Sequence, residues 1–204
     1  MTLSDATRGR NRRPALRAAW RRTRAPGARP GLDNALLRHD PRAVAITLDL
    51  LRHGLALPAG AADDRERVLS PVGLNGIEAL AAHLAREAWR PDRIFSSPYA
   101  RAQQSAGIVA GAAAPPVAVE ILRDLEPERD SSEVLDALAR LGITAGHILV
   151  VGHQPLLGLL VGRLTGFEQG FSPGMLVRVH DPQGLVQGSG RITLTLEPKD
   201  LEPA

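Results

Sequence analysis

The sequence of 204 residues contains no cysteine, which excludes disulfide bonds, zinc sites built on thiolates and cysteine nucleophiles. No apolar run approaches the roughly 20 residues that a membrane-spanning helix needs, and aromatic residues make up only 3% of the chain. Lysine occurs once, at Lys199. These absences predict a soluble cytoplasmic protein without a membrane segment, and they leave the six histidines as the leading candidates for covalent chemistry.

Positive charge is concentrated at the start of the chain. Residues 1–45 hold eleven arginines against three acidic residues, a net charge of +8, whereas residues 46–204 have a net charge of −5. The pairs Arg12-Arg13 and Arg21-Arg22 are not followed by the apolar segment that would complete a secretory or twin-arginine export signal. We therefore predict a disordered, Arg-rich N-terminal arm over 1–45, with a specific anchor as the alternative, and one domain over 46–204. Nucleic-acid binding is disfavoured, since Trp20 is the only aromatic residue in the arm.

From Ala45 onward, short apolar runs alternate with amphipathic stretches, a pattern typical of α/β layers. The runs predict strands over 44–51, 93–96, 117–122, 147–151, 175–180 and 190–196, of which the last two form a possible hairpin. The amphipathic stretches predict helices over 71–89, 98–111, 132–141 and 155–164. The fold class that follows is a three-layer α/β/α arrangement around a mostly parallel sheet.

Two helix starts can be predicted from single residues. Ser70 is a candidate N-cap with Pro71 at the first helical position, and Ser97 a candidate N-cap of a helix opened by Pro98. The 3.6-residue period predicts the apolar face of the first helix, which consists of Leu74, Ile77, Leu84, Ala85 and Ala88.

Polar residues that suit an anion follow three of the predicted strands. Arg52 and His53 follow the first strand, Arg101 lies one turn into the helix after the second, and His153 follows the fourth. Ligands of open α/β sheets bind beyond the carboxyl ends of the strands, so these side chains should share one rim. Arginine matches phosphate oxygens two at a time, and neutral imidazole can accept a phosphoryl group. The rim is a candidate phosphoryl-transfer site.

The remaining histidines have ordinary interpretations. His39 lies in the linker, His83 on a helix, and His147 and His180 at strand termini without a predicted polar cluster. No pair has metal-ligand spacing on one face, so we assign no metal and no cofactor.

Four ordered motifs resemble those of the histidine phosphatase superfamily, and within it the small SixA-type phosphohistidine phosphatases. They are Leu51-Arg52-His53-Gly54, Leu69-Ser70-Pro71-Val72-Gly73, Ser96–Ser105 and Val151-Gly152-His153-Gln154-Pro155. The resemblance covers residues 46–197 and implies a phosphoglycerate-mutase-like fold. Leu55 departs from it, since many relatives carry an acidic or polar residue there, and the first 45 residues have no counterpart in the minimal SixA-type domain.

The resemblance implies a reaction mechanism and a role in it for each of the four rim residues. Arg52, Arg101 and His153 would hold the phosphoryl oxygens while His53 attacks phosphorus to give a phosphohistidine intermediate. For this attack, a backbone carbonyl must accept the other ring N–H of His53, and Gly54 would allow the required close approach. The family's usual proton donor is a carboxylate after the third strand. Asp124 is the first candidate and Glu126 the second, although both are equally consistent with ordinary solvated loop carboxylates.

Only 22 residues separate Arg101 from Asp124, which leaves no room for a large lid. A bare rim favours an exposed phosphoryl group on a large substrate, so we expect a metal-independent phosphatase of phosphohistidine on a protein. One alternative is a phosphatase of a small phosphoester. Another, from a different class, is a non-catalytic module that binds phosphate or a partner.

Overall fold

The computed structural model describes residues 45–60 and 63–201. The predicted arm lies outside the described residues, apart from Ala45. The strands are β1 (Ile46–Arg52), β2 (Arg93–Ser96), β3 (Val119–Ile121), β4 (Gly146–Gly152), β5 (Leu176–Asp181) and β6 (Arg191–Leu196). The helices are α1 (Pro71–Arg86), α2 (Ala100–Ala110), α3 (Ser131–Arg140) and α4 (Leu156–Thr165), with 3-10 turns η1 (Asp64–Glu66), η2 (Arg123–Leu125) and η3 (Pro198–Asp200).

The strands form one six-stranded sheet in the order β3-β2-β4-β1-β5-β6. The pairs β3–β2, β2–β4 and β4–β1 are parallel, whereas β5 runs antiparallel to both β1 and β6. The predicted final hairpin is therefore confirmed, and the sheet is mixed but mostly parallel. Six strands and four helices match the predicted α/β class, with element boundaries that differ by a few residues.

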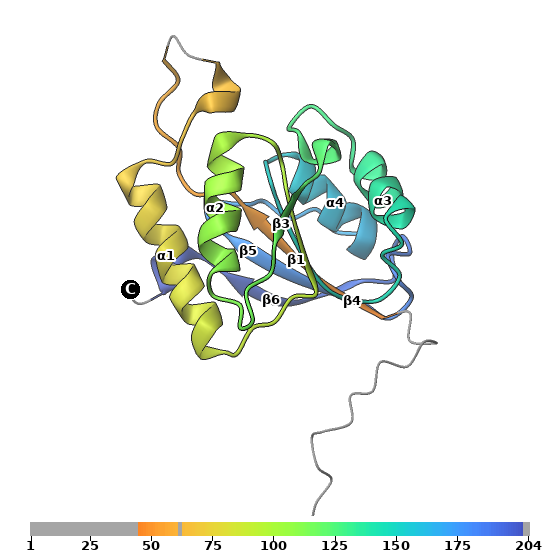
Figure 1. Cartoon of the computed structure of the whole chain (residues 1–204). Coiled ribbons are helices and arrows are strands. Elements are labelled where there is room, and N and C mark those ends of the chain that lie inside the picture. Colours follow the sequence, from red (N-terminus) through yellow and green to blue (C-terminus); the bar gives the residue numbers. More distant parts are fainter. Residues whose placement is uncertain (1–44, 61–62, 202–204) are drawn as a thin grey trace, which may run out of the picture. The chain divides into compact units, whose positions relative to one another are not determined.

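The sheet lies between two pairs of helices. Figure 1 shows α1 and α2 on one side of the sheet and α3 and α4 on the other. Alternation along β1 supplies both cores: Leu48 and Leu50 pack with residues of α3 and α4, and Leu51 packs with residues of α1 and α2. Within the described residues, no helix is long and apolar enough to cross a membrane.

Helix α1 begins as predicted, but its apolar face differs. Ser70 Oγ accepts a hydrogen bond from Gly73 N–H at 3.1 Å, and Pro71 occupies the first helical position. Ala85 and Ala88, assigned to the apolar face, are exposed: Ala85 lies beside the buried side of the last turn, and Ala88 lies beyond the end of the helix at Arg86. The buried side of α1 consists of Gly73, Ile77, Ala79, Leu80 and Leu84.

The predicted cap of α2 is wrong. The helix begins at Ala100, with Tyr99 at the N-cap position and no side-chain capping bond. Ser97 lies directly after β2, and its Oγ is 2.9 Å from Nε2 of His153. Because β2 ends at Ser96 beside the end of β4, the Ser97 hydroxyl lies next to His153. Ser97 therefore belongs to the rim of the sheet and not to the helix.

His147 was not expected to meet a polar cluster, and this prediction is also wrong. Its Nε2 lies 2.7 Å from Oδ2 of Asp49, a fully buried carboxylate on β1. Asp49 also accepts from Trp89 Nε1 at 2.7 Å and from Nε and Nη2 of Arg178 at 2.6 and 2.9 Å. Burial raises the pKa of Asp49, but hydrogen bonds from His147 and Arg178 outweigh it and the pKa is lowered. The cluster satisfies a buried charge within the sheet.

Candidate active site

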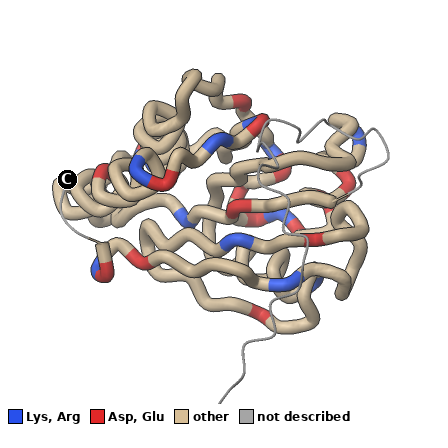
Figure 2. The backbone as a smooth tube through the Cα atoms, turned by 90° about the horizontal axis from the view of Figure 1, so that it is seen from below, with Lys and Arg blue, Asp and Glu red and all other residues tan. Residues whose placement is uncertain are grey.

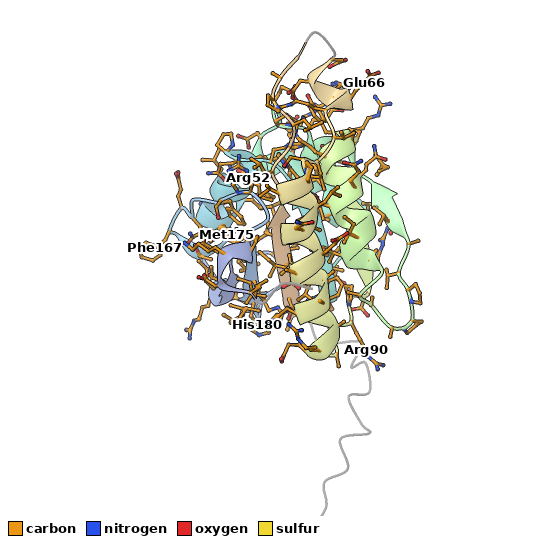
Figure 3. The ribbon with its side chains drawn as sticks, turned by 90° about the vertical axis from the view of Figure 1, so that its left-hand side faces the viewer. Arg52, Glu66, Arg90, Phe167, Met175 and His180 are labelled. Atoms are coloured by element: carbon orange, nitrogen blue, oxygen red, sulfur yellow. The ribbon has the colours of Figure 1, made fainter. Side chains whose placement is uncertain are left out.

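The four histidine and arginine candidates follow strands that are neighbours in the sheet. Arg52 pairs in register with Gly152 at the ends of β1 and β4, so His53 and His153 follow paired positions. Their ring centroids lie 5.0 Å apart. Arg101 comes from α2, whose preceding strand β2 lies on the other side of β4. In Figure 3, Arg52 and Glu66 lie toward one end of the molecule, while His180 and Arg90 lie toward the opposite end.

The hydrogen bonds of His53 define which ring nitrogen carries a proton. Nδ1 lies 2.7 Å from the carbonyl oxygen of Gly54, and Nε2 lies 3.2 Å from Nε of Arg101. A carbonyl only accepts and a guanidinium only donates, so Nδ1 carries the hydrogen and Nε2 presents its lone pair. The acceptor that the mechanism requires is therefore the carbonyl of the next residue.

The backbone at Gly54 leaves no space for a side chain. A Cβ atom there would lie 2.8 Å from both the carbonyl oxygen of Gly73 and Cγ1 of Ile77. The Gly54 N–H donates to Ser105 Oγ at 3.1 Å, and that hydroxyl donates to the carbonyl of Arg101 at 2.7 Å. The loop after β1 is thus packed on α1 and tied to α2, which holds the carbonyl facing His53.

Both histidines are buried among positive groups, which keeps them neutral at pH 7. Burial, together with the charges of Arg101, Arg52 and Arg67, lowers the pKa of His53 to about 4, although its bond to Gly54 acts in the opposite direction. Burial lowers the pKa of His153 to about 3, together with the positive charge that His53 acquires when it is protonated near pH 4 and the charge of Arg101. A neutral imidazole is the nucleophilic form.

Arg101 is fixed by contacts on its face and its edges. Its side chain is only 5% exposed, and its guanidinium lies over the ring of Tyr99, 4.8 Å from the centroid. Besides the bond to His53, Nη1 donates to the carbonyl of Asp64 at 2.6 Å and Nη2 to Oδ2 of Asp64 at 2.9 Å. The same Tyr99 ring packs edge-on against His153 at 4.9 Å.

Two buried polar atoms of the site lack a hydrogen-bond partner among the described residues. They are Nε of Arg52 and Nδ1 of His153. Arg52 Nη1 donates to the carbonyl of Phe171 at 2.5 Å. Burial and the charge of Arg101 lower the pKa of Arg52. Buried polar atoms without partners are costly, and an oxyanion among them would satisfy the Arg52 donor and offset the gathered positive charge.

The two candidate proton donors lie in different surroundings. Asp124, on η2, accepts from Nη2 of Arg140 at 3.3 Å, which ties it to α3. Glu126 is buried and pairs with Nη2 of Arg65 at 3.0 Å. Neither carboxylate has a hydrogen bond to the four residues of the rim. The role of Asp124 as proton donor stays a prediction.

Several residues of the site were missed from the sequence. Tyr99 stands inside the motif that carries Arg101 and could have been noticed there, whereas Asp64 and the Phe171 carbonyl are recognisable only once the chain is folded. Across the described residues, no group of three or more His, Asp or Glu side chains could hold a metal ion. Metal independence stays a prediction.

Known proteins match both the sequence and the fold. A family model described as "Histidine phosphatase superfamily (branch 1)" matches residues 48–130. The phosphohistidine phosphatase SixA of Escherichia coli (strain K12) is 33% identical over 122 residues, which cover 58% of this chain and 74% of the relative.

Solved structures give the same result for the fold. The structure of the protein histidine phosphatase SixA complexed with tungstate has a TM-score of 0.68 and 26% identity, and covers 76% of this chain and 99% of that one. A SixA-type protein from Agrobacterium tumefaciens has a TM-score of 0.63 and 23% identity, with coverage of 74% and 97%. This chain belongs to the histidine phosphatase superfamily (branch 1), as an enzyme that resembles SixA.

Proposed function

We propose that this enzyme is a metal-independent phosphatase that works through a phosphohistidine intermediate on His53 and removes the phosphoryl group from phosphohistidine on a protein. The observation that carries the proposal is the state of His53. Its Nε2 atom is unprotonated and lies 3.2 Å from Arg101 Nε. The ring is buried, and its pKa is lowered to about 4. Such a group is ready to attack phosphorus at neutral pH.

The reaction takes place in two displacements. In the first, Nε2 of His53 forms a bond to phosphorus, the bond from phosphorus to the substrate imidazole breaks, and the released imidazole takes a proton from solvent. In the second, water attacks phosphorus, the bond to Nε2 breaks, and inorganic phosphate leaves. Arg52, Arg101 and His153 hold the phosphoryl oxygens and stabilise the charge of the transition states.

Three observations support phosphohistidine on a protein as the substrate. Between α2 and η2 the chain contains only a loop and the three-residue strand β3, so no long insertion covers the rim on that side. The relative from Escherichia coli is itself named a phosphohistidine phosphatase, and the similar solved structure holds tungstate, a tetrahedral oxyanion. An imidazole leaving group also departs more readily than an alkoxide, so the reaction tolerates a weak proton donor.

Trapping the intermediate tests the proposal. A protein phosphorylated on histidine with a radioactive label should transfer acid-labile phosphate to the parent enzyme, and His53→Ala should abolish both this transfer and turnover. His180→Ala is the matched control, because His180 is an exposed histidine on β5. Label on another residue of the enzyme would contradict the assignment of His53. Faster turnover of sugar or glycerate phosphates than of the phosphohistidine protein would contradict the assigned substrate.

A further inference from the structure

The guanidinium of Arg101 offers two edges, and they face different groups. The outer edge, Nη1 and Nη2, donates to the backbone carbonyl and to Oδ2 of one residue, Asp64, at 2.6 and 2.9 Å. The inner edge includes Nε, which points at Nε2 of His53 from 3.2 Å, together with the second N–H of Nη2. Asp64 therefore occupies one edge of the arginine and leaves the other edge facing the nucleophile.

We infer that Asp64 is a positioning residue for phosphoryl transfer: it holds the outer edge of Arg101 so that the inner edge meets the phosphoryl group on His53. The inference rests on the proposed function. A guanidinium that has to bind two phosphoryl oxygens at once works best when its orientation is set beforehand, because the entropy of ordering it is then not lost during the reaction. The Tyr99 ring supports the plane of the guanidinium, and Asp64 sets its rotation within that plane.

Asp64 is itself held in place by neighbouring arginines. Its Oδ1 accepts from Nη2 of Arg67 at 2.7 Å, and the turn η1 that carries it is anchored by the ion pair of Arg65 with Glu126. Partial burial raises the pKa of Asp64, but Arg101 and Arg67 outweigh it and the pKa is lowered, so the group is a carboxylate at pH 7. Its negative charge also opposes the lowering of the His153 pKa.

The opposite role would be that of a competitor, in which the Asp64 carboxylate mimics phosphate and must leave before substrate binds. The contacts favour positioning. A competitor would occupy the edge that faces His53, whereas Asp64 uses the outer edge, and one of its two acceptors is an uncharged backbone carbonyl that a phosphoryl group has no need to displace. The side chain of Asp64 is 51% exposed, so its removal leaves the hydrophobic core intact.

A double-mutant cycle tests the inference. Asp64→Ala should lower kcat/KM for a phosphohistidine protein by about tenfold, and Asp64→Asn, which keeps an acceptor for Nη2, should recover part of the loss. In an Arg101→Ala background, the same Asp64→Ala change should alter kcat/KM by less than about twofold, since there is no guanidinium left to orient. Glu66→Ala is the matched control, because Glu66 lies on the same turn, is exposed and does not contact Arg101.

Binding of tungstate, measured by calorimetry, provides a readout apart from turnover. Asp64→Ala should weaken tungstate binding, while Glu66→Ala should not. Tighter tungstate binding and a higher kcat/KM in Asp64→Ala would establish a competitor and overturn the inference, and equal losses in both Arg101 backgrounds would show that Asp64 acts only on the structure of the loop. If Arg101→Ala alone has no effect on kcat/KM, the proposed function fails first. If Arg101 matters and Asp64 does not, only the positioning role fails.

Discussion

The chemistry of His53 depends on two hydrogen bonds, one to a carbonyl that can only accept and one from a guanidinium that can only donate. The Gly54 carbonyl fixes the proton on Nδ1, and the Arg101 guanidinium opposes a second proton on Nε2. Burial strengthens both effects, because an imidazolium would have to lose its hydration beside several positive groups. The nucleophile is thus prepared before any substrate arrives, at the cost of holding Arg52 and Arg101 close together.

This arrangement predicts how stability depends on pH. The unfolded chain protonates histidine near pH 6.5, whereas His53 in the folded chain does so near pH 4, so the unfolded state binds more protons between these values. The free energy of unfolding should therefore fall as pH drops from 6.5 to 4, by at most about 1.4 kcal/mol per pH unit from this group. Denaturant titrations across the window measure the slope. The charges that lower the pKa of His53 are those of Arg101, Arg52 and Arg67.

The variant His53→Asn isolates this contribution, since asparagine places an amide near the position of Nδ1 and does not titrate. Its unfolding free energy should decline less steeply than that of the parent between pH 6.5 and 4. His180→Asn removes an exposed histidine and should keep the parent slope. Parallel curves for His53→Asn and the parent would show that the folded pKa of His53 is not lowered.

Among the elements, the strands were predictable because each is a short apolar run with a clear end. The candidate site could then be predicted from the arginine and histidine residues that follow those ends. Arg52, His53 and His153 could be placed on one rim from this rule alone, and the parallel order β2-β4-β1 brings them together with Arg101. The rule carries no information about turns, so it did not predict η1, the turn in which Asp64 contacts Arg101. It also misassigned Ser97, because Ser97-Pro98 resembles a helix start, whereas α2 begins two residues later, at Ala100.

Two helical glycines, Gly73 on α1 and Gly107 on α2, should respond in opposite ways to substitution by alanine. A Cβ at Gly73 would collide with the carbonyl of Leu55, so Gly73→Ala should destabilise the fold by about 1 to 3 kcal/mol and displace the loop that carries His53. A Cβ at Gly107, exposed in the middle of α2, would meet no atom within 4 Å. Gly107→Ala should therefore stabilise the protein by roughly 0.5 to 1 kcal/mol. Thermal unfolding of both variants measures these effects, and equal melting temperatures for Gly73→Ala and the parent would contradict the predicted collision.

For the whole molecule, the distribution of charge separates two parts that differ in composition. Figure 2 shows basic and acidic positions interspersed along the described backbone. Residues 46–204 have a net charge of −5, whereas residues 1–45 have a net charge of +8. All described catalytic candidates come from the acidic part, so we expect the basic residues of the first part to affect encounters with a partner and not the chemistry.

We therefore expect the first 42 residues to be dispensable for the chemistry. They hold eleven arginines and few apolar groups, so they have little surface to bury against a domain whose sheet, helices and rim lie entirely within later residues. Deleting residues 1–42 should preserve kcat on a small phosphorylated substrate and leave the melting temperature unchanged. With an acidic phosphoprotein, the deletion should lower kcat/KM at low salt and have little effect at high salt, because screening removes long-range attraction.

Replacing the arginines of this segment with glutamine in the full-length chain is the matched control, and it should reproduce the salt-dependent loss. A truncated enzyme that unfolds, or that loses activity on the small substrate, would show that the first segment packs on the domain and that the boundary near residue 45 is wrong.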